Sequence, residues 1–143
     1  MRVFIAGIMQ GSRTDKGIDA QDYRRELAQI LQNHVDGVEI IDPITLHPKS
    51  VDYSPEQAKQ TLLELLALAG RVDVLIAFVP TASMGTALEI WHAYQGNARI
   101  YTISPLTSNW VVQSFSERVF PNMAAFTTFV ADGGLETDES RGE

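Results

Sequence analysis

The sequence predicts a single α/β domain in which a mainly parallel, doubly wound sheet lies between two layers of helices. Four short runs of mainly apolar residues recur along the chain, and segments with helical periodicity separate them. Strands that are apolar on both faces are covered on both sides, which is typical of a parallel sheet. Because crossovers between parallel strands are right-handed, this alternation of strands and helices builds three layers. A length of 143 residues suits one such domain with a substantial core.

The apolar runs predict strands over residues 3–6, 38–41, 74–79 and 100–103. The first run belongs to an apolar opening that ends at Met9 and is preceded only by Arg2. This opening is too short to cross a bilayer and lacks the flanks of a signal peptide. We therefore expect a buried first strand and a cytoplasmic protein without a membrane segment.

Three helices are expected between these strands. Residues 20–34 carry apolar side chains at spacings of three and four, as an amphipathic helix does. Ser54 can cap the next helix and Pro55 suits its first turn, and this helix is expected to end at Gly70. A third helix is expected over residues 84–96.

The sequence pattern indicates secondary structure less clearly in the last part of the chain, residues 110–143. Residues 110–117 are expected to form a helix that Pro121 follows, and residues 123–130 fit either a helix or an edge strand. Residues 136–143 include four acidic side chains and nothing apolar to bury. We therefore expect a folded domain over residues 1–132 and a disordered acidic tail over residues 133–143.

The composition excludes several classes of function. Eleven Lys and Arg residues stand against eighteen Asp and Glu residues, so the net charge is −7. An acidic chain lacks the basic footprint that nucleic-acid polymers and anionic membranes require. The absence of cysteine excludes a disulfide framework, a thiolate metal site and a cysteine nucleophile. His34, His47 and His92 show no metal-ligand spacing, so no metal site is expected.

A ligand is expected at the carboxyl ends of the strands, where the strand order of an open α/β sheet reverses. The loop after the first strand places Gly7, Gly11 and Ser12 there, so that backbone amides can approach a ligand closely. Its spacing matches neither a dinucleotide fingerprint nor a phosphate-binding P-loop. A plain flexible connection is the alternative interpretation.

The loop after the third strand runs into a helix whose first amides and dipole favour a negative group. Glu89 lies near the start of this helix, where an ionised carboxylate could attack an anomeric carbon or shield an oxocarbenium ion. Residues 86–89 also read as a capping box, in which Glu89 would bond to the start of its own helix. Both interpretations of Glu89 remain open at this point.

Four segments together resemble the nucleoside 2-deoxyribosyltransferase superfamily, which includes 2'-deoxynucleoside 5'-phosphate N-hydrolases. They are Phe4-Ile5-Ala6-Gly7, Tyr23-Arg24, Val72-Asp73-Val74 and Ser83-x-Gly85-Thr86-x-x-Glu89. The resemblance covers roughly residues 2–112 and implies a flavodoxin-like sheet of about five strands. It also implies cleavage of an N-glycosidic bond without a cofactor, with Glu89 as the nucleophile.

The resemblance implies further roles around that glutamate. Transferases of the superfamily tend to carry an aspartate six residues before it, which holds the sugar 5'-hydroxyl, whereas the nucleotide hydrolases carry a serine for a 5'-phosphate. This chain has Ser83, which favours a phosphate together with the amide of Gly85. Asn109 lies where family members lend a residue to a neighbouring subunit, so a homodimer or higher homo-oligomer is expected.

Two positions depart from the family pattern. Phe4 replaces a tyrosine of the first strand, and Leu65 replaces an aspartate that handles the leaving base. Asp42 and His47, in the loop after the second strand, could contact the base instead.

The sequence thus predicts an enzyme that cleaves the N-glycosidic bond of a nucleoside or nucleoside 5'-monophosphate, with hydrolysis favoured. Base exchange between nucleosides and nucleotide binding without catalysis are the alternatives.

Overall fold

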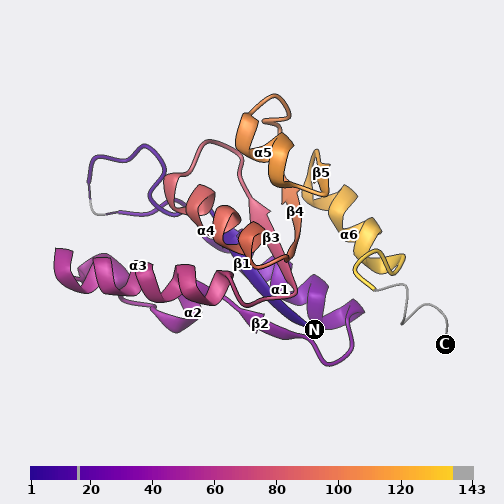
Figure 1. Ribbon diagram of the computed structural model, residues 1–143, viewed down its shortest axis with the longest axis horizontal. Coiled ribbons are helices and arrows are strands. Elements are labelled where there is room, and N and C mark those ends of the chain that lie inside the picture. The colour runs from indigo at the N-terminus through magenta and orange to yellow at the C-terminus, as the bar shows by residue number, and fades with distance from the viewer. Residues whose placement is uncertain (16, 137–143) are drawn as a thin grey trace.

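The computed structural model describes residues 1–15 and 17–136 and shows a five-stranded, entirely parallel sheet (Figure 1). Its strands are β1 (Arg2–Gly7), β2 (Glu39–Ile41), β3 (Val74–Phe78), β4 (Arg99–Ile103) and β5 (Arg118–Phe120). They lie side by side in the order β2-β1-β3-β4-β5. This is the flavodoxin-like order, so the predicted fold class is confirmed.

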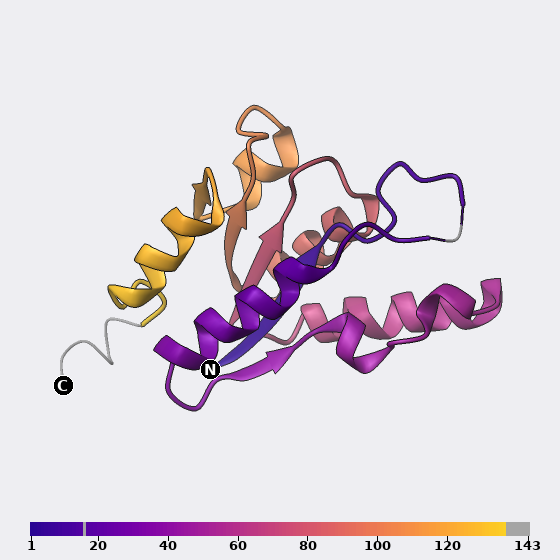
Figure 2. The same cartoon turned by 180° about the vertical axis from the view of Figure 1, so that it is seen from behind.

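Helices cover both faces of the sheet, as Figures 1 and 2 show from opposite sides. The helical segments are α1 (Asp22–His34), α2 (Pro43–Leu46), a 3₁₀ turn (Ser50–Asp52), α3 (Pro55–Ala69), α4 (Met84–Gln95), α5 (Trp110–Phe115) and α6 (Met123–Ala131). The face with α1 and α6 and the face with α3 and α4 each bury an apolar cluster. In the part of the chain that is described, no helix is long and apolar enough to cross a membrane.

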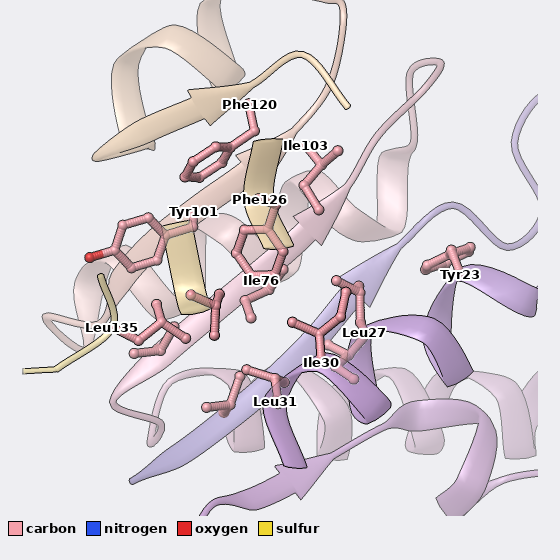
Figure 3. Packing of buried hydrophobic residues seen from close by; sticks show 14 residues of the cluster. Tyr23, Leu27, Ile30, Leu31, Ile76, Tyr101, Ile103, Phe120, Phe126 and Leu135 are labelled. Carbon is pink, nitrogen blue, oxygen red and sulfur yellow. The ribbon is translucent and has the colours of Figure 1, made fainter. Parts of the chain in front are cut away.

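Successive side chains of each strand point to opposite faces of the sheet, so the strands contribute to both apolar clusters. Val3 and Ile5 of β1 point to the α1 and α6 face, whereas Phe4 and Ala6 point to the α3 and α4 face, and all four are fully buried. Figure 3 shows the first cluster, where Leu27 and Leu31 of α1 approach Ile76 of β3. The two-sided burial explains why the strand sequences read as apolar runs.

The four predicted strands and three predicted helices are present, with ends that differ by one or two residues. The capping box expected at Ser54 is formed, since its hydroxyl accepts a hydrogen bond from the amide of Gln57 while the Gln57 side chain accepts one from the Ser54 amide. The ambiguous segment 123–130 is helix α6, which Asn122 caps.

Three features differ from the sequence-based expectation. The helix expected over residues 110–117 ends at Phe115, and the chain then forms β5 beside β4. The loop after β2 contains α2 and the 3₁₀ turn. Leu135 is buried among the α6-side core residues and its carbonyl accepts a hydrogen bond from Arg99, so the folded domain extends past the predicted boundary at residue 132. Residues 137–143 of the predicted tail lie outside the described part.

Candidate active site

The strand order reverses between β1 and β3, because the chain leaves β1 toward β2 on one side and β3 toward β4 on the other. A cleft of about 320 Å³ opens at the carboxyl ends of these two strands, and we call it the main cleft. The loop after β1 and the first turns of α3 project beyond the sheet on the same side in both views (Figures 1 and 2). These two segments, residues 47–53 and the start of α4 form its walls.

The amino-terminal end of α4 opens into the main cleft. Ser83 caps the helix, since its Oγ accepts a hydrogen bond of 3.3 Å from the amide of Thr86 and lies 2.8 Å from the Thr86 hydroxyl. The amides of Met84 and Gly85 have no hydrogen-bond partner among the described residues. A Cβ added to Gly85 would meet nothing within 4 Å, so its backbone faces open space. This end of the cleft therefore presents free N–H donors and the positive end of a helix dipole.

Glu89 lies in the second turn of α4 and lines the main cleft. The residue is partly exposed, yet its Oε2 atom is fully buried and has no hydrogen-bond partner among the described residues. Burial raises the pKa of the Glu89 carboxyl to about 8, and the positive charge of Arg24 opposes that rise. A buried, unpartnered carboxyl with a raised pKa in a cleft is typical of a functional group rather than a structural one.

The capping interpretation of Glu89 is wrong. Helix α4 begins at Met84, so Glu89 is its sixth residue, and the hydroxyl of Ser83 occupies the capping position at the amide of Thr86. Among the described residues the Glu89 side chain makes no hydrogen bond that would cap the helix.

Arg24 of α1 carries the positive charge beneath the cleft. It is only 3% exposed, and its Nη1 and Nη2 atoms donate to the backbone carbonyls of Ile5 and Gly7 at 3.0 and 3.2 Å. Nη1 also donates to Asp42 Oδ1 at 3.1 Å, and Nε donates to Gln21 at 2.7 Å. The guanidinium therefore ties β1 to the loop after β2 and places a fixed charge near Glu89.

The three predicted glycines of the site and Ser83 meet at the main cleft. Gly7, Gly11, Ser83 and Gly85 line the main cleft together with Glu89. Gly7 has no room for a side chain because the Tyr23 ring lies against it, and Gly11 has a φ of +56°, which favours glycine. Both positions therefore require glycine for structural reasons, and a plain flexible connection does not account for them.

Ser12 and Asn109 line a second cavity of about 370 Å³ on the other side of the α4 start, between α4 and α5. Ser83 lines both cavities. The Asn109 Oδ1 atom caps α5 by accepting from the amides of Val111 and Val112, so its side-chain amide nitrogen is left for another partner.

Asp42 does not line either cavity, contrary to the expectation that it contacts the substrate. Its Oδ1 atom accepts from Arg24 and from the amide of Ile44, and its Oδ2 atom lies 3.4 Å from the hydroxyl of Thr45. The carboxylate is occupied as the cap of α2 and as the partner of Arg24, which is a structural role.

His47 does line the main cleft, as do Tyr53 and Leu65. The Nδ1 atom of His47 lies 2.9 Å from the hydroxyl of Tyr53, and the two rings meet edge to face at 87°. Leu62, Leu65 and Ile18 make the neighbouring surface apolar. This part of the cleft suits a flat, mainly apolar group with polar atoms at its rim.

Sequence reasoning missed the roles of Arg24 and Tyr53. Arg24 lies three residues before Leu27 and seven before Leu31, on the buried stripe of α1, and a charged residue on such a stripe signals a buried pair. No comparable signal marks Tyr53. In the described part of the chain, no group of three or more His, Asp or Glu side chains is arranged to hold a metal ion.

No family model and no curated protein matches this sequence. Solved structures with a similar fold include a 2-deoxyribosyltransferase from the psychrotolerant bacterium Bacillus psychrosaccharolyticus, with a TM-score of 0.67, 14% identity, and coverage of 99% of this chain and 95% of that one. They also include a CMP N-glycosidase of Clostridium botulinum, BcmB, with a TM-score of 0.52, 18% identity, and coverage of 90% of this chain and 96% of that one. A conserved protein of Enterococcus faecalis V583 has a TM-score of 0.58 at 14% identity, with coverage of 94% and 99%.

These neighbours confirm, at the level of fold, the resemblance that the sequence motifs indicated. The chain has the three-layer architecture of a 2-deoxyribosyltransferase and of a CMP N-glycosidase over nearly its whole length.

Proposed function

We propose that this protein is an enzyme that cleaves the N-glycosidic bond of a nucleoside 5'-monophosphate, with Glu89 as nucleophile and water as acceptor. The observation that carries the proposal is the buried, unpartnered Oε2 of Glu89 in a cleft whose rim is a free helix terminus. Neighbours of the same fold that act on N-glycosidic bonds, by name a 2-deoxyribosyltransferase and a CMP N-glycosidase, support it.

The geometry suits a two-step displacement. In its ionised form, Glu89 attacks C1' of the sugar while the bond to the base breaks, and the electron pair of that bond leaves with the base. The charge of Arg24 stabilises the ionised carboxylate, which burial otherwise disfavours. Water then attacks C1' and releases Glu89. These steps use only groups of this chain, the substrate and water.

The start of α4 suits the 5'-phosphate. The amides of Met84 and Gly85 are free to donate, and the Ser83 hydroxyl can donate to a ligand when Thr86 donates to it. Ser83→Asp tests this role, because aspartate also caps a helix well but places a negative charge against the phosphate.

We also propose that the protein acts as a homo-oligomer in which Asn109 approaches the site of a neighbouring subunit. Met84, which lines the second cavity, is 84% exposed, and Trp110, which is 82% exposed, lies between the lining residues Asn109 and Val111. Large apolar side chains gathered at a cleft entrance favour a surface that another subunit covers.

The test compares kcat/KM for one nucleoside with and without its 5'-phosphate, measured by chromatography of the released base in the presence of a second free base. We expect the monophosphate to be preferred, hydrolysis to outrun exchange, and Ser83→Asp to reverse the preference. Faster exchange than hydrolysis would identify a deoxyribosyltransferase. A thermal shift with nucleotides but no released base would identify a binding module.

A further inference from the structure

Departure of a nucleobase requires a proton, because a base that leaves as an anion is a poor leaving group. In this chain Leu65 stands where the family that it resembles has an aspartate, and the aliphatic side chain has no proton to give. Glu89 cannot supply the proton in the same step, since it must be ionised to attack C1'. The acid for the base must therefore come from another side chain of the main cleft.

Among the described residues that line the main cleft, the titratable side chains are those of Glu89, His47 and Tyr53. Asp42, the acidic candidate that the sequence offered beside His47, is held by Arg24 and by the amide of Ile44 and does not line the cleft. Of the remaining pair, histidine is the residue type that most often acts as a general acid in enzymes, and tyrosine does so less often.

The local structure fixes the imidazole of His47. The His47 amide donates to the carbonyl of Pro43 at 2.9 Å, and the His47 carbonyl accepts from the amide of Ser50 at 3.2 Å. The ring contacts the Tyr53 hydroxyl through Nδ1 at 2.9 Å, whereas Nε2 has no hydrogen-bond partner among the described residues. When the Tyr53 oxygen accepts from Nδ1–H, the nitrogen left to exchange a proton with a ligand is Nε2.

The apolar surface beside His47 could form the binding site for the base. Leu62 and Leu65 of α3 and Ile18 of the loop after β1 line the same cleft as His47 and Glu89, but they come from different elements. A flat heteroaromatic ring suits this surface, and its ring nitrogens would meet the imidazole at the rim.

We propose that His47 is the general acid that protonates the leaving base, and that Tyr53 is a positioning residue that orients its ring. This inference rests on the proposed function. As the imidazolium, His47 gives its Nε2 proton to a ring nitrogen or carbonyl oxygen of the base while the C1'–N bond breaks and Glu89 bonds to C1'. The base leaves neutral and His47 becomes a neutral imidazole. In the second step the attacking water loses a proton to Nε2, which restores the imidazolium as Glu89 is released.

The test compares leaving groups that depend differently on an acid. Wild type, His47→Gln and Tyr53→Phe are assayed with whichever base class the wild type cleaves, in parent and activated form, against a blank without enzyme. The pairs are guanine and N7-methylguanine, or uracil and 5-fluorouracil, each as the nucleoside 5'-monophosphate. In the N7-methylguanine nucleotide the base is already cationic, so it takes the electron pair of the breaking bond and leaves neutral without a proton, and its release is insensitive to a lost acid.

We expect His47→Gln to lower kcat with the parent base by about 100-fold or more. With the activated base, the fold loss in kcat should be at least ten times smaller. Tyr53→Phe should show a smaller loss with the same dependence on leaving group, because the hydroxyl acts through the imidazole. His34→Gln, which changes a histidine at the end of α1, is the matched control and should resemble the wild type for both bases.

Equal losses for parent and activated bases in His47→Gln, at unchanged Tm, would overturn the role of His47 as acid. Activity that Glu89→Gln abolishes and His47→Gln retains would leave the proposed function standing and remove this inference. No release of any base by the wild type would overturn both.

Discussion

The substitution Glu89→Gln is expected to abolish turnover and at the same time to stabilise the fold. Its buried Oε2 has no partner among the described residues, and burial raises the pKa of the carboxyl from an ordinary value of 4.5 to about 8. Glutamine keeps the shape and neutrality of the protonated side chain but has no proton to lose. The substitution therefore removes the nucleophile and the energetic penalty of ionising it together.

The magnitude follows from proton linkage. Between the unfolded and folded pKa values the native chain binds more protons than the unfolded chain, so the free energy of unfolding falls as the pH rises through this range. The free energy of unfolding falls by about 1.4 kcal/mol for each pH unit above the unfolded pKa of about 4.5. At pH 7 the total decrease is therefore roughly 3 kcal/mol. Water in the open cleft reduces this penalty, so we expect a gain of about 2 kcal/mol for the variant.

The assay is urea unfolding of wild type and variant at several pH values, followed by circular dichroism. The stability difference should be near zero at about pH 4, grow with pH and level off above about pH 8, with a rise in Tm on the order of 5 °C at neutral pH. Glu64→Gln, which changes an exposed glutamate of α3, is the matched control and should change neither stability nor turnover.

Two results would refute this reasoning. A pH-independent stability difference would show that the buried carboxyl does not carry the raised pKa. A variant that melts lower and retains full activity would show that Glu89 has a structural role and that the nucleophile lies elsewhere.

Arg24→Met should destabilise the fold by about 3 kcal/mol in thermal or urea unfolding, because it leaves the carboxylate of Asp42 partly buried without its partner. The same change should raise the pKa of Glu89 further. In that background, the stability difference that Glu89→Gln makes should level off at a higher pH. Gly85→Ala should raise the stability by about 0.5–1 kcal/mol yet weaken nucleotide monophosphates more than nucleosides in titration calorimetry, because its methyl enters the space at the helix start. Mixing inactive Glu89→Gln with inactive Asn109→Ala subunits should restore about a quarter of the activity in a two-fold dimer, and a monomer in sedimentation at micromolar concentration would end this prediction.

Local sequence patterns determined most of the fold. The apolar runs identified four of the five strands, because strands that helices bury on both faces are mainly apolar. Ser54 and Pro55 marked the start of α3, since capping depends on neighbours three residues apart. Strand β5 escaped prediction because it begins with Arg118 directly after Glu117 and shows no apolar run, and only its pairing with β4 makes it a strand.

The sequence also indicated Glu89 and Ser83, because both belong to one short segment that starts a helix and resembles a motif of the nucleoside 2-deoxyribosyltransferase superfamily. What it left open was decided by contacts between distant segments. Asp42 and His47 were equal candidates for contact with the base until the fold paired Asp42 with Arg24, 18 residues earlier, and left His47 on the cleft wall. The unpartnered Oε2 and the raised pKa of the Glu89 carboxyl likewise follow from burial by neighbouring elements. Capping is local and readable from spacing, whereas burial and charge pairing arise only when remote parts of the chain exclude water together.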